Sequence, residues 1–179
     1  MKIQNLLVIT SLVFSFFSAI PVNINAQVGA LDLSFDTDGI ATTSFGAGDG
    51  YAYSIAIQSD GKIVVAGYSD TGSQDLFAIA RYNTNGTLDN SFGIDGIVTT
   101  AIAGSSSNRA HGVAIQSDGK IVAVGYYGSA STGNDFAVVR YNTNGSLDLS
   151  FDSDGIASTN FDLTSNDRAF SVAIQTDRK

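Results

Sequence analysis

Two short segments of this chain carry aspartates at the alternate positions that a calcium-binding loop uses. They read Asp36-x-Asp38-Gly39 and Asp152-x-Asp154-Gly155. Alternate carboxylates followed by a glycine can wrap a hard cation such as Ca²⁺. The full pattern needs a third ligand two residues further on, where isoleucine stands in both segments. The pattern therefore favours a tight structural turn over a calcium site, and Asp36, Asp38, Asp152 and Asp154 remain the calcium candidates.

Three tyrosines beside polar loops are the candidates for a binding surface: Tyr68, Tyr126 and Tyr127. The loops that follow them are rich in Ser, Gly, Asp and Asn, and they differ between the copies of a repeated segment described below. Tyrosine with short polar neighbours suits recognition of carbohydrate or protein, and specificity usually lies in variable loops. Ordinary surface loops are the alternative, and the composition favours them.

No arrangement of residues in the sequence predicts a catalytic or cofactor-binding site. His111, the only histidine, aligns with Tyr53 and Phe170 in a repeated segment, which predicts a packing role. Arg81 and Arg140 each precede a tyrosine and are followed by an aspartate at the start of the next repeat, so we expect structural ion pairs. Every acidic residue is an aspartate, and turns account for them.

The composition narrows the class of fold and the class of partner. A formal charge of −8 disfavours nucleic acid and anionic membrane surfaces as partners. The absence of cysteine excludes disulfides and thiolate metal sites. Glutamate, a helix former, is absent, whereas 19 glycines and many Ser, Thr, Asn and β-branched residues favour short strands and turns.

Residues 1–26 have the layout of a secretory signal peptide. Lys2 precedes an uncharged apolar run over residues 6–20, which Pro21 ends before a small residue at Ala26. A retained membrane anchor is the alternative, but the run is shorter than the roughly 20 apolar residues of a spanning helix. We therefore expect export, a mature chain that begins at Gln27, and no stable membrane insertion after cleavage.

The pattern Leu-Asp-x-Ser-Phe-x-x-Asp-Gly-Ile begins at Leu31, Leu88 and Leu147, and it divides the chain into repeats of about 60 residues. Two units are complete, 31–87 and 88–146, and a partial unit covers 147–179. A repeat of this length is typical of a supersecondary module that buries its apolar faces against copies of itself.

Each complete unit contains four apolar runs that predict strands. The first unit has them at 39–45, 53–58, 63–68 and 77–83. The matching runs lie at 96–102, 111–116, 121–126 and 136–142, and the partial unit has 155–161 and 170–175. The Asp-Gly pairs at Gly61 and Gly119 predict hairpin turns. The runs are apolar on both faces, so each sheet must be covered on both sides.

These patterns predict an all-β fold of repeated four-stranded antiparallel units, arranged like the blades of a β-propeller. A stacked β-solenoid is the alternative, although such coils usually have shorter periods. About two and a half units fall short of the 4 to 8 blades of a closed ring, so we expect an incomplete ring. The open sheet edges that result are expected to permit self-association.

The repeated motifs resemble the delta-60 repeat, a β-propeller family of bacterial exported proteins. The residues that carry the resemblance are Leu31–Phe35, Asp38–Ile40, Ala56–Gly67, Phe77–Asn83 and Gly86–Asp89. The resemblance covers essentially all of Leu31–Lys179, so we expect one repeat domain over 27–179. It implies a propeller-like fold and secretion or cell-surface display in a bacterium, with no assigned function. Many such relatives are longer multi-repeat chains, so we expect a fragment of a longer repeat protein.

The leading functional interpretation is an exported, non-enzymatic repeat module that serves as a surface scaffold or binds carbohydrate or protein. The alternative is a fragment of a propeller enzyme whose catalytic residues lie in other blades. No cofactor is expected, with calcium at the aspartate turns as the one exception that the sequence leaves open.

Overall fold

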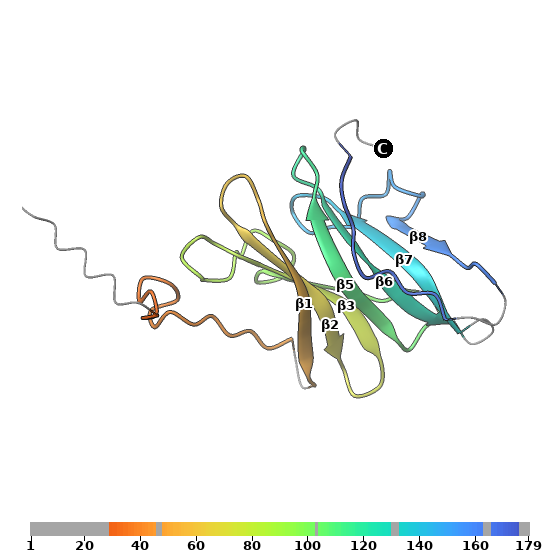
Figure 1. Cartoon of the computed structure of the whole chain (residues 1–179), viewed down its shortest axis with the longest axis horizontal. Coiled ribbons are helices and arrows are strands. Elements are labelled where there is room, and N and C mark those ends of the chain that lie inside the picture. Colours follow the sequence, from red (N-terminus) through yellow and green to blue (C-terminus); the bar gives the residue numbers. More distant parts are fainter. Residues whose placement is uncertain (1–28, 46–47, 103, 130–132, 163–165, 176–179) are drawn as a thin grey trace, which may run out of the picture. The chain divides into compact units, whose positions relative to one another are not determined.

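The computed structural model describes residues 29–45, 48–102, 104–129, 133–162 and 166–175, and the predicted signal peptide 1–26 lies outside them. The unit Leu31–Lys179 holds all the strands and is described by itself. Its first sheet contains β1 (Gly50–Ile57), β2 (Ile63–Asp70), β3 (Asp75–Tyr82) and β4 (Ile97–Thr100). Its second sheet contains β5 (Asn108–Ile115), β6 (Ile121–Ser129), β7 (Gly133–Tyr141) and β8 (Ile156–Thr159) (Figure 1).

Both sheets are antiparallel, with their strands side by side in chain order. The described residues contain no helix. The predicted all-β fold of repeated four-stranded antiparallel units is therefore confirmed, and the two sheets are consistent with propeller blades of an incomplete ring.

The grouping of strands into sheets differs from the grouping that the sequence suggested. The run 96–102 opens the second sequence unit, but its strand β4 pairs with β3 of the first sheet. In the same way β8, which follows the third Leu-Asp pattern, closes the second sheet on β7. Each sheet is therefore completed by a strand from the next sequence unit, which pairs with the strand that precedes it in the chain.

Two of the predicted strands, 39–45 and 170–175, are not strands in the structure. In the repeat they correspond to β4 and to the end of β1, each of which pairs with a neighbour within its sheet. A strand is defined by its ladder of hydrogen bonds, and neither segment is part of a ladder with a described strand. Apolar patterning alone is therefore insufficient to form a strand here.

The segment 40–45 still lies against the first sheet as β4 lies against the second. Thr43 Oγ1 shares a hydrogen bond of 2.5 Å with the Tyr82 hydroxyl. Thr100 Oγ1 makes the equivalent bond of 2.8 Å to the Tyr141 hydroxyl. The side chains of a preceding repeat are thus docked on the first sheet even without a strand ladder.

The hairpin turns form as the Asp-Gly pairs predict. Gly61 and Gly119 have φ angles of 84° and 83°, in the left-handed region that glycine adopts at no steric cost. In the first turn, the Asp60 carboxylate accepts a bond from the Lys62 backbone N–H at 3.1 Å. The prediction of turns at these positions is therefore confirmed.

A β-bulge interrupts β1 in the first sheet and β5 in the second, at the same place in the repeat. We call β1 and β5 the inner strands. Register with β2 shifts between Ala52 and Ser54, and register with β6 shifts between Ala110 and Gly112. A Cβ on Gly67, opposite the first bulge, would lie 1.7 Å from the Tyr51 carbonyl oxygen. Glycine at this position lets the bulged strand approach its neighbour. Gly125 has the same role in the second sheet, where the clash would be at 1.9 Å.

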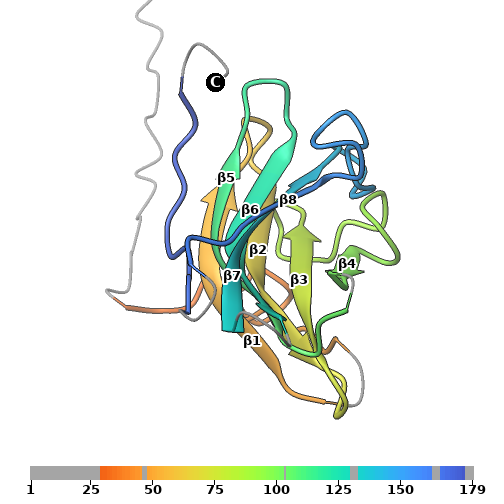
Figure 2. The same cartoon turned by 90° about the vertical axis from the view of Figure 1, so that its right-hand side faces the viewer.

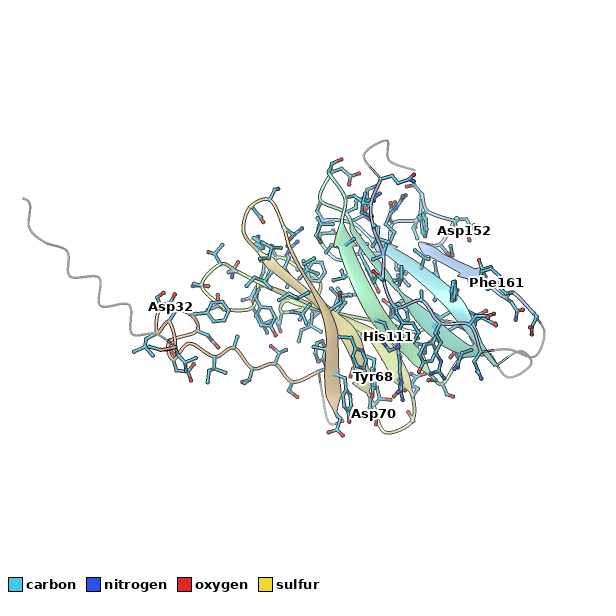
Figure 3. All side chains as sticks on the ribbon, in the orientation of Figure 1. Asp32, Tyr68, Asp70, His111, Asp152 and Phe161 are labelled. Carbon is cyan, nitrogen blue, oxygen red and sulfur yellow. The ribbon has the colours of Figure 1, made fainter. Side chains whose placement is uncertain are left out.

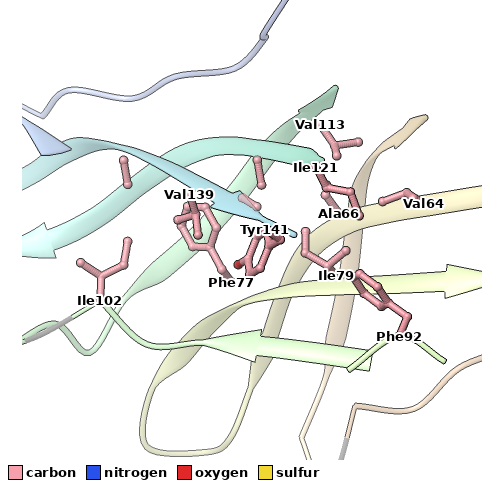
Figure 4. Packing of buried hydrophobic residues seen from close by; sticks show 13 residues of the cluster. Val64, Ala66, Phe77, Ile79, Phe92, Ile102, Val113, Ile121, Val139 and Tyr141 are labelled. Carbon is pink, nitrogen blue, oxygen red and sulfur yellow. The ribbon is translucent and has the colours of Figure 1, made fainter. Parts of the chain in front are cut away.

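The core lies between the two sheets, where one face of the first sheet meets the opposite face of the second (Figure 4). Strand β5 contacts β1, β2 and β3, and it lies against the first sheet in both views (Figures 1 and 2). Small residues allow this close approach, among them Ala110, Ala123 and Ala137, all completely buried. Ser54 Oγ accepts a bond of 3.1 Å from the Val113 backbone N–H, directly between the sheets.

Candidate functional site

A row of three rings from successive repeats lies along the start of the inner strands. Tyr53 and His111 are the extra residues at the two β-bulges, and Phe170 stands at the equivalent position of the next repeat. The ring centroids of Tyr53 and His111 are 4.7 Å apart, and those of His111 and Phe170 are 5.1 Å apart. Bulges re-aim side chains out of the strand alternation, so these rings meet although they come from different repeats. We call these three residues the aromatic row.

Much of the aromatic row is accessible to solvent. Tyr53 is 48% exposed and Phe170 is 66% exposed, whereas His111 between them is partly buried. Tyr51, two residues before Tyr53, is 45% exposed and stacks on Tyr68 at 4.7 Å. Exposed aromatic rings that are held by other rings form a surface that can stack against a ligand.

An arginine beside each buried tyrosine supports the row. The Arg109 guanidinium lies 4.3 Å from the Tyr68 ring centroid, and its Nε donates to Asp75 Oδ2 at 2.6 Å. Arg109 and Asp75 belong to different sheets, so this cation–π and ion-pair contact joins the sheets. Burial raises the pKa of Tyr68 to about 12, so its hydroxyl stays protonated at neutral pH.

The next repeat makes an equivalent contact with a different hydrogen-bond acceptor. The Arg168 guanidinium lies 4.8 Å from the Tyr126 ring centroid. When the Asn134 amide is oriented with its oxygen toward Arg168, that oxygen accepts bonds of 2.9 Å from Nη2 and 3.2 Å from Nε. An amide thus replaces the carboxylate of Asp75 at this contact.

The three tyrosines that the sequence proposed as a binding surface are placed differently from that expectation. Tyr68 and Tyr126 are only 6% and 5% exposed, so the expectation that they face solvent is wrong. Each is covered because an arginine of the following repeat stacks on its ring. Tyr127 is partly buried and packs against the core. A ligand-binding role for these residues stays a prediction.

His111 is held in the row by rings on several sides. It stacks on Tyr126 at 5.5 Å in addition to its contacts within the row. Burial lowers its pKa, and the positive charges of Arg168 and Arg109 add to this effect, so the imidazole is uncharged at pH 7. Its Nε2 atom is buried and has no hydrogen-bond partner within the described residues. These contacts support the packing role that the alignment predicts.

A cluster of Arg, Asp and Lys side chains joins the start of β2 to the end of β3, and the second sheet has the same cluster at β6 and β7. Arg81 Nε donates to Asp89 Oδ2 at 2.7 Å, and Lys62 Nζ donates to the same oxygen at 2.8 Å. The positive charges and the Ser91 hydrogen bonds hold the pKa of Asp89 well below its usual range, although burial opposes them. The predicted ion pair of Arg81 is confirmed, whereas Lys62 was missed, although a lysine recurs after both Asp-Gly turns.

The second sheet repeats this cluster with the same geometry. Arg140 Nε lies 2.6 Å from Asp148 Oδ2, and Lys120 Nζ lies 2.9 Å from it. The guanidinium groups of Arg81 and Arg140 lie 4.6 Å from the rings of Phe92 and Phe151, respectively. The predicted ion pair of Arg140 is therefore confirmed as well. Because these ion pairs and cation–π contacts recur in both sheets, they stabilise the structure of each repeat.

The two segments with calcium candidates form turns, and in each turn the second aspartate uses its carboxylate locally. Asp38 Oδ1 accepts the Ile40 backbone N–H at 2.9 Å, and Asp154 Oδ1 accepts that of Ile156 at 2.8 Å. Asp36 and Asp152 both have a φ of 45°, which their short side chains tolerate. Within the described part of the chain, no three His or Asp residues are grouped so that they could hold a metal ion. The turn geometry agrees with the structural alternative.

A polar cleft lies between the sheets at the far end of the inner strands from the aromatic row. It has a volume of about 690 Å³, and Gln58, Lys62, Arg81, Gln116 and Thr143 are among its lining residues. Gln58 Nε2 donates to the Gly119 carbonyl across the cleft at 3.4 Å. The cleft therefore lies between the sheets beside the two Asp-Gly turns, and the aromatic row lies at the opposite end of β1 and β5.

Comparison with known protein families agrees with this architecture. A family model described as "Domain of unknown function (DUF5122) beta-propeller" matches residues 58–92 and 116–151. Both stretches run from an Asp-Gly turn through the two middle strands to the next Leu-Asp pattern. The chain therefore contains propeller-type repeats.

No curated protein matches the chain. The described residues include no helix that could span a lipid bilayer.

Proposed function

We propose that the chain is an exported, non-enzymatic repeat module that serves as a surface scaffold or as a binding unit for carbohydrate or protein. One observation carries the proposal: the strongly paired charged groups recur in the same arrangement in both sheets. The Arg81–Asp89–Lys62 cluster and its counterpart Arg140–Asp148–Lys120 stabilise the fold of each repeat. An active site would be expected to break this equivalence in one repeat.

The finer family and the cellular location are part of the same proposal. The recurring Leu-Asp-x-Ser-Phe motifs support membership of the delta-60 class, and the layout of residues 1–26 supports export to the surface or the medium of a bacterium. The apolar side chains of Ile55 and Ile57 are 64% and 70% exposed on a face whose counterpart in the second sheet is covered. This supports packing of further repeats on that face, as in a longer repeat protein.

Export can be tested with the full chain carrying a C-terminal epitope tag in a bacterial host. We expect the tagged protein in the periplasm, on the surface or in the medium, with an N-terminus at Gln27. Replacement of Leu7 and Val8 by aspartate breaks the apolar run and is expected to keep the protein in the cytoplasm. A wild-type protein that stays in the cytoplasm and starts at Met1 would contradict the proposal.

A further inference from the structure

The aromatic row is built by a local departure from regular strand geometry that recurs. A bulge leaves one residue of the strand unpaired, and the unpaired residues are Tyr53 in β1 and His111 in β5. The bulge needs Gly67 and Gly125 on the neighbouring strands, where any side chain would collide with the backbone. Each repeat therefore keeps an irregularity that aims a ring at the ring of the next repeat.

The row is rigid although it is exposed. Tyr53 stacks on Tyr68 at 5.9 Å and His111 stacks on Tyr126 at 5.5 Å, and both tyrosines are buried. The guanidinium groups of Arg109 and Arg168 also lie over the rings of these two tyrosines. A surface that is already ordered before binding loses little conformational entropy when a ligand stacks on it.

Polar groups that can recognise hydroxyl groups flank the rings. The side chain of Arg109 is 34% exposed beside the carboxylate of Asp75, and Arg168 is exposed beside the amide of Asn134. Both arginines act on the charge of His111, so they lie within electrostatic reach of the row. Guanidinium donors next to carboxylate and amide acceptors can bind pairs of neighbouring hydroxyl groups.

The negative net charge of the chain makes some ligands with flat rings less favourable than others. A net charge of −8 disfavours a nucleic acid, whose bases would otherwise suit exposed rings. A neutral sugar ring fits such a surface, because its C–H groups can stack on an aromatic face while its hydroxyls reach the polar groups at the edge.

We propose that the aromatic row binds a neutral carbohydrate chain, with sugar rings stacked on Tyr53 and Phe170 and with Arg109 and Arg168 donating hydrogen bonds to hydroxyl groups. This inference rests on the proposed binding function and names the site and the ligand class. It differs from the surface that the sequence suggested, because Tyr68 and Tyr126 support the rings from below.

The test is affinity electrophoresis of the purified full-chain product in gels that contain laminarin, hydroxyethylcellulose or soluble starch. Polygalacturonate serves as the anionic comparison. We expect at least one neutral glycan to retard the protein, and Tyr53→Ala and Phe170→Ala each to raise its dissociation constant about tenfold. Phe161→Ala is the matched control, because Phe161 is 68% exposed, follows β8 and contacts the ring of Phe136 and none of the rings of the row (Figure 3).

Three outcomes would overturn the inference: no retardation by any neutral glycan, retardation by polygalacturonate alone, or equal binding by the wild type and the row variants. Thermal melting followed by circular dichroism establishes that each variant folds. Phe170 lies outside both sheets, so its replacement keeps the test decisive if Tyr53→Ala does not fold. A protein that is exported but binds no glycan would overturn this inference and leave the export proposal standing.

Discussion

The two sheets have nearly the same sequence and hydrogen-bond register, but equivalent residues differ widely in burial. Ile55 in the first sheet is 64% exposed, whereas Val113 at the equivalent position is 8% exposed. Ile63 is partly buried and Ile121 is completely buried. The face of the second sheet that carries these residues lies against the first sheet. A single sheet of this kind therefore cannot bury its own side chains, and its stability must come from its neighbour.

The largest expected effect follows from the pair Ile121 and Ile63. Ile121→Ala is expected to lower the free energy of unfolding by about 2–5 kcal/mol, because it removes buried methyl groups from the junction. Ile63→Ala removes the same atoms from a less covered face, and we expect a loss of about 1 kcal/mol or less. Urea unfolding of both variants measures the difference. Equal losses would show that the two faces are equally covered in solution.

The two Arg–Asp–Lys clusters allow the same comparison with a charged group. Arg81 also donates through Nη1 to the carbonyl of Thr143, in the turn that follows β7, at 2.5 Å, and its side chain is 6% exposed against 20% for Arg140. Arg81→Met is expected to lower the free energy of unfolding by about 3 kcal/mol, because the buried carboxylate of Asp89 loses one of its hydrogen-bond partners. Arg140→Met is expected to cost less, since solvent replaces more of its contacts. Urea unfolding again gives both values, and a larger loss for Arg140→Met would contradict the assignment of the junction.

The exposed face of the first sheet predicts self-association. Double replacement of Ile55 and Ile57 by lysine puts two charges on this face, and we expect it to weaken self-association about tenfold in sedimentation velocity runs. Ile94→Lys is the matched control, because Ile94 is 81% exposed outside this face. A wild-type protein that stays monomeric at all concentrations, or a control that also becomes monomeric, would contradict the role of the face.

The smallest expected effect concerns pH and the aromatic row. The pKa of His111 is lowered in the folded protein, so the unfolded chain binds a proton more readily below about pH 6.5. The neutral His111 therefore does not lower the free energy of unfolding above about pH 6.5. As the pH falls from there toward the lowered pKa of His111, protonation of the unfolded chain reduces the free energy of unfolding. Phe170 occupies the equivalent position, so His111→Phe is a natural replacement, and the variant should lose less stability between about pH 6.5 and 5. Thermal melts across this range measure it, and parallel curves would contradict the assignment.

The local features of the fold could be predicted from the sequence because they depend on neighbouring residues. Gly61 fixes a turn through its own φ angle, and Arg81 pairs with an aspartate eight residues away. The order of strands in each sheet could not be predicted in the same way. The repeat shows that β4 recurs, but its position beside β3 depends on which sheet edge is free in the folded chain.

The candidate site was visible in the sequence only in part. The alignment of Tyr53, His111 and Phe170 shows that a ring recurs, but the alignment does not reveal a bulge. The burial of Tyr68 also escaped prediction, because its cover comes from Arg109 in another sheet. A residue next to a variable loop was expected at the surface, whereas the following repeat decides its exposure.

Because every sheet is closed by a strand from the next sequence unit, the boundaries of the repeat in the gene and in the fold do not coincide. Duplication or loss of one whole period in the gene would therefore add or remove one complete sheet wherever the break fell, and each remaining sheet would keep its closing strand. We therefore expect a gene of this kind to change its length by recombination between copies while the protein keeps complete sheets.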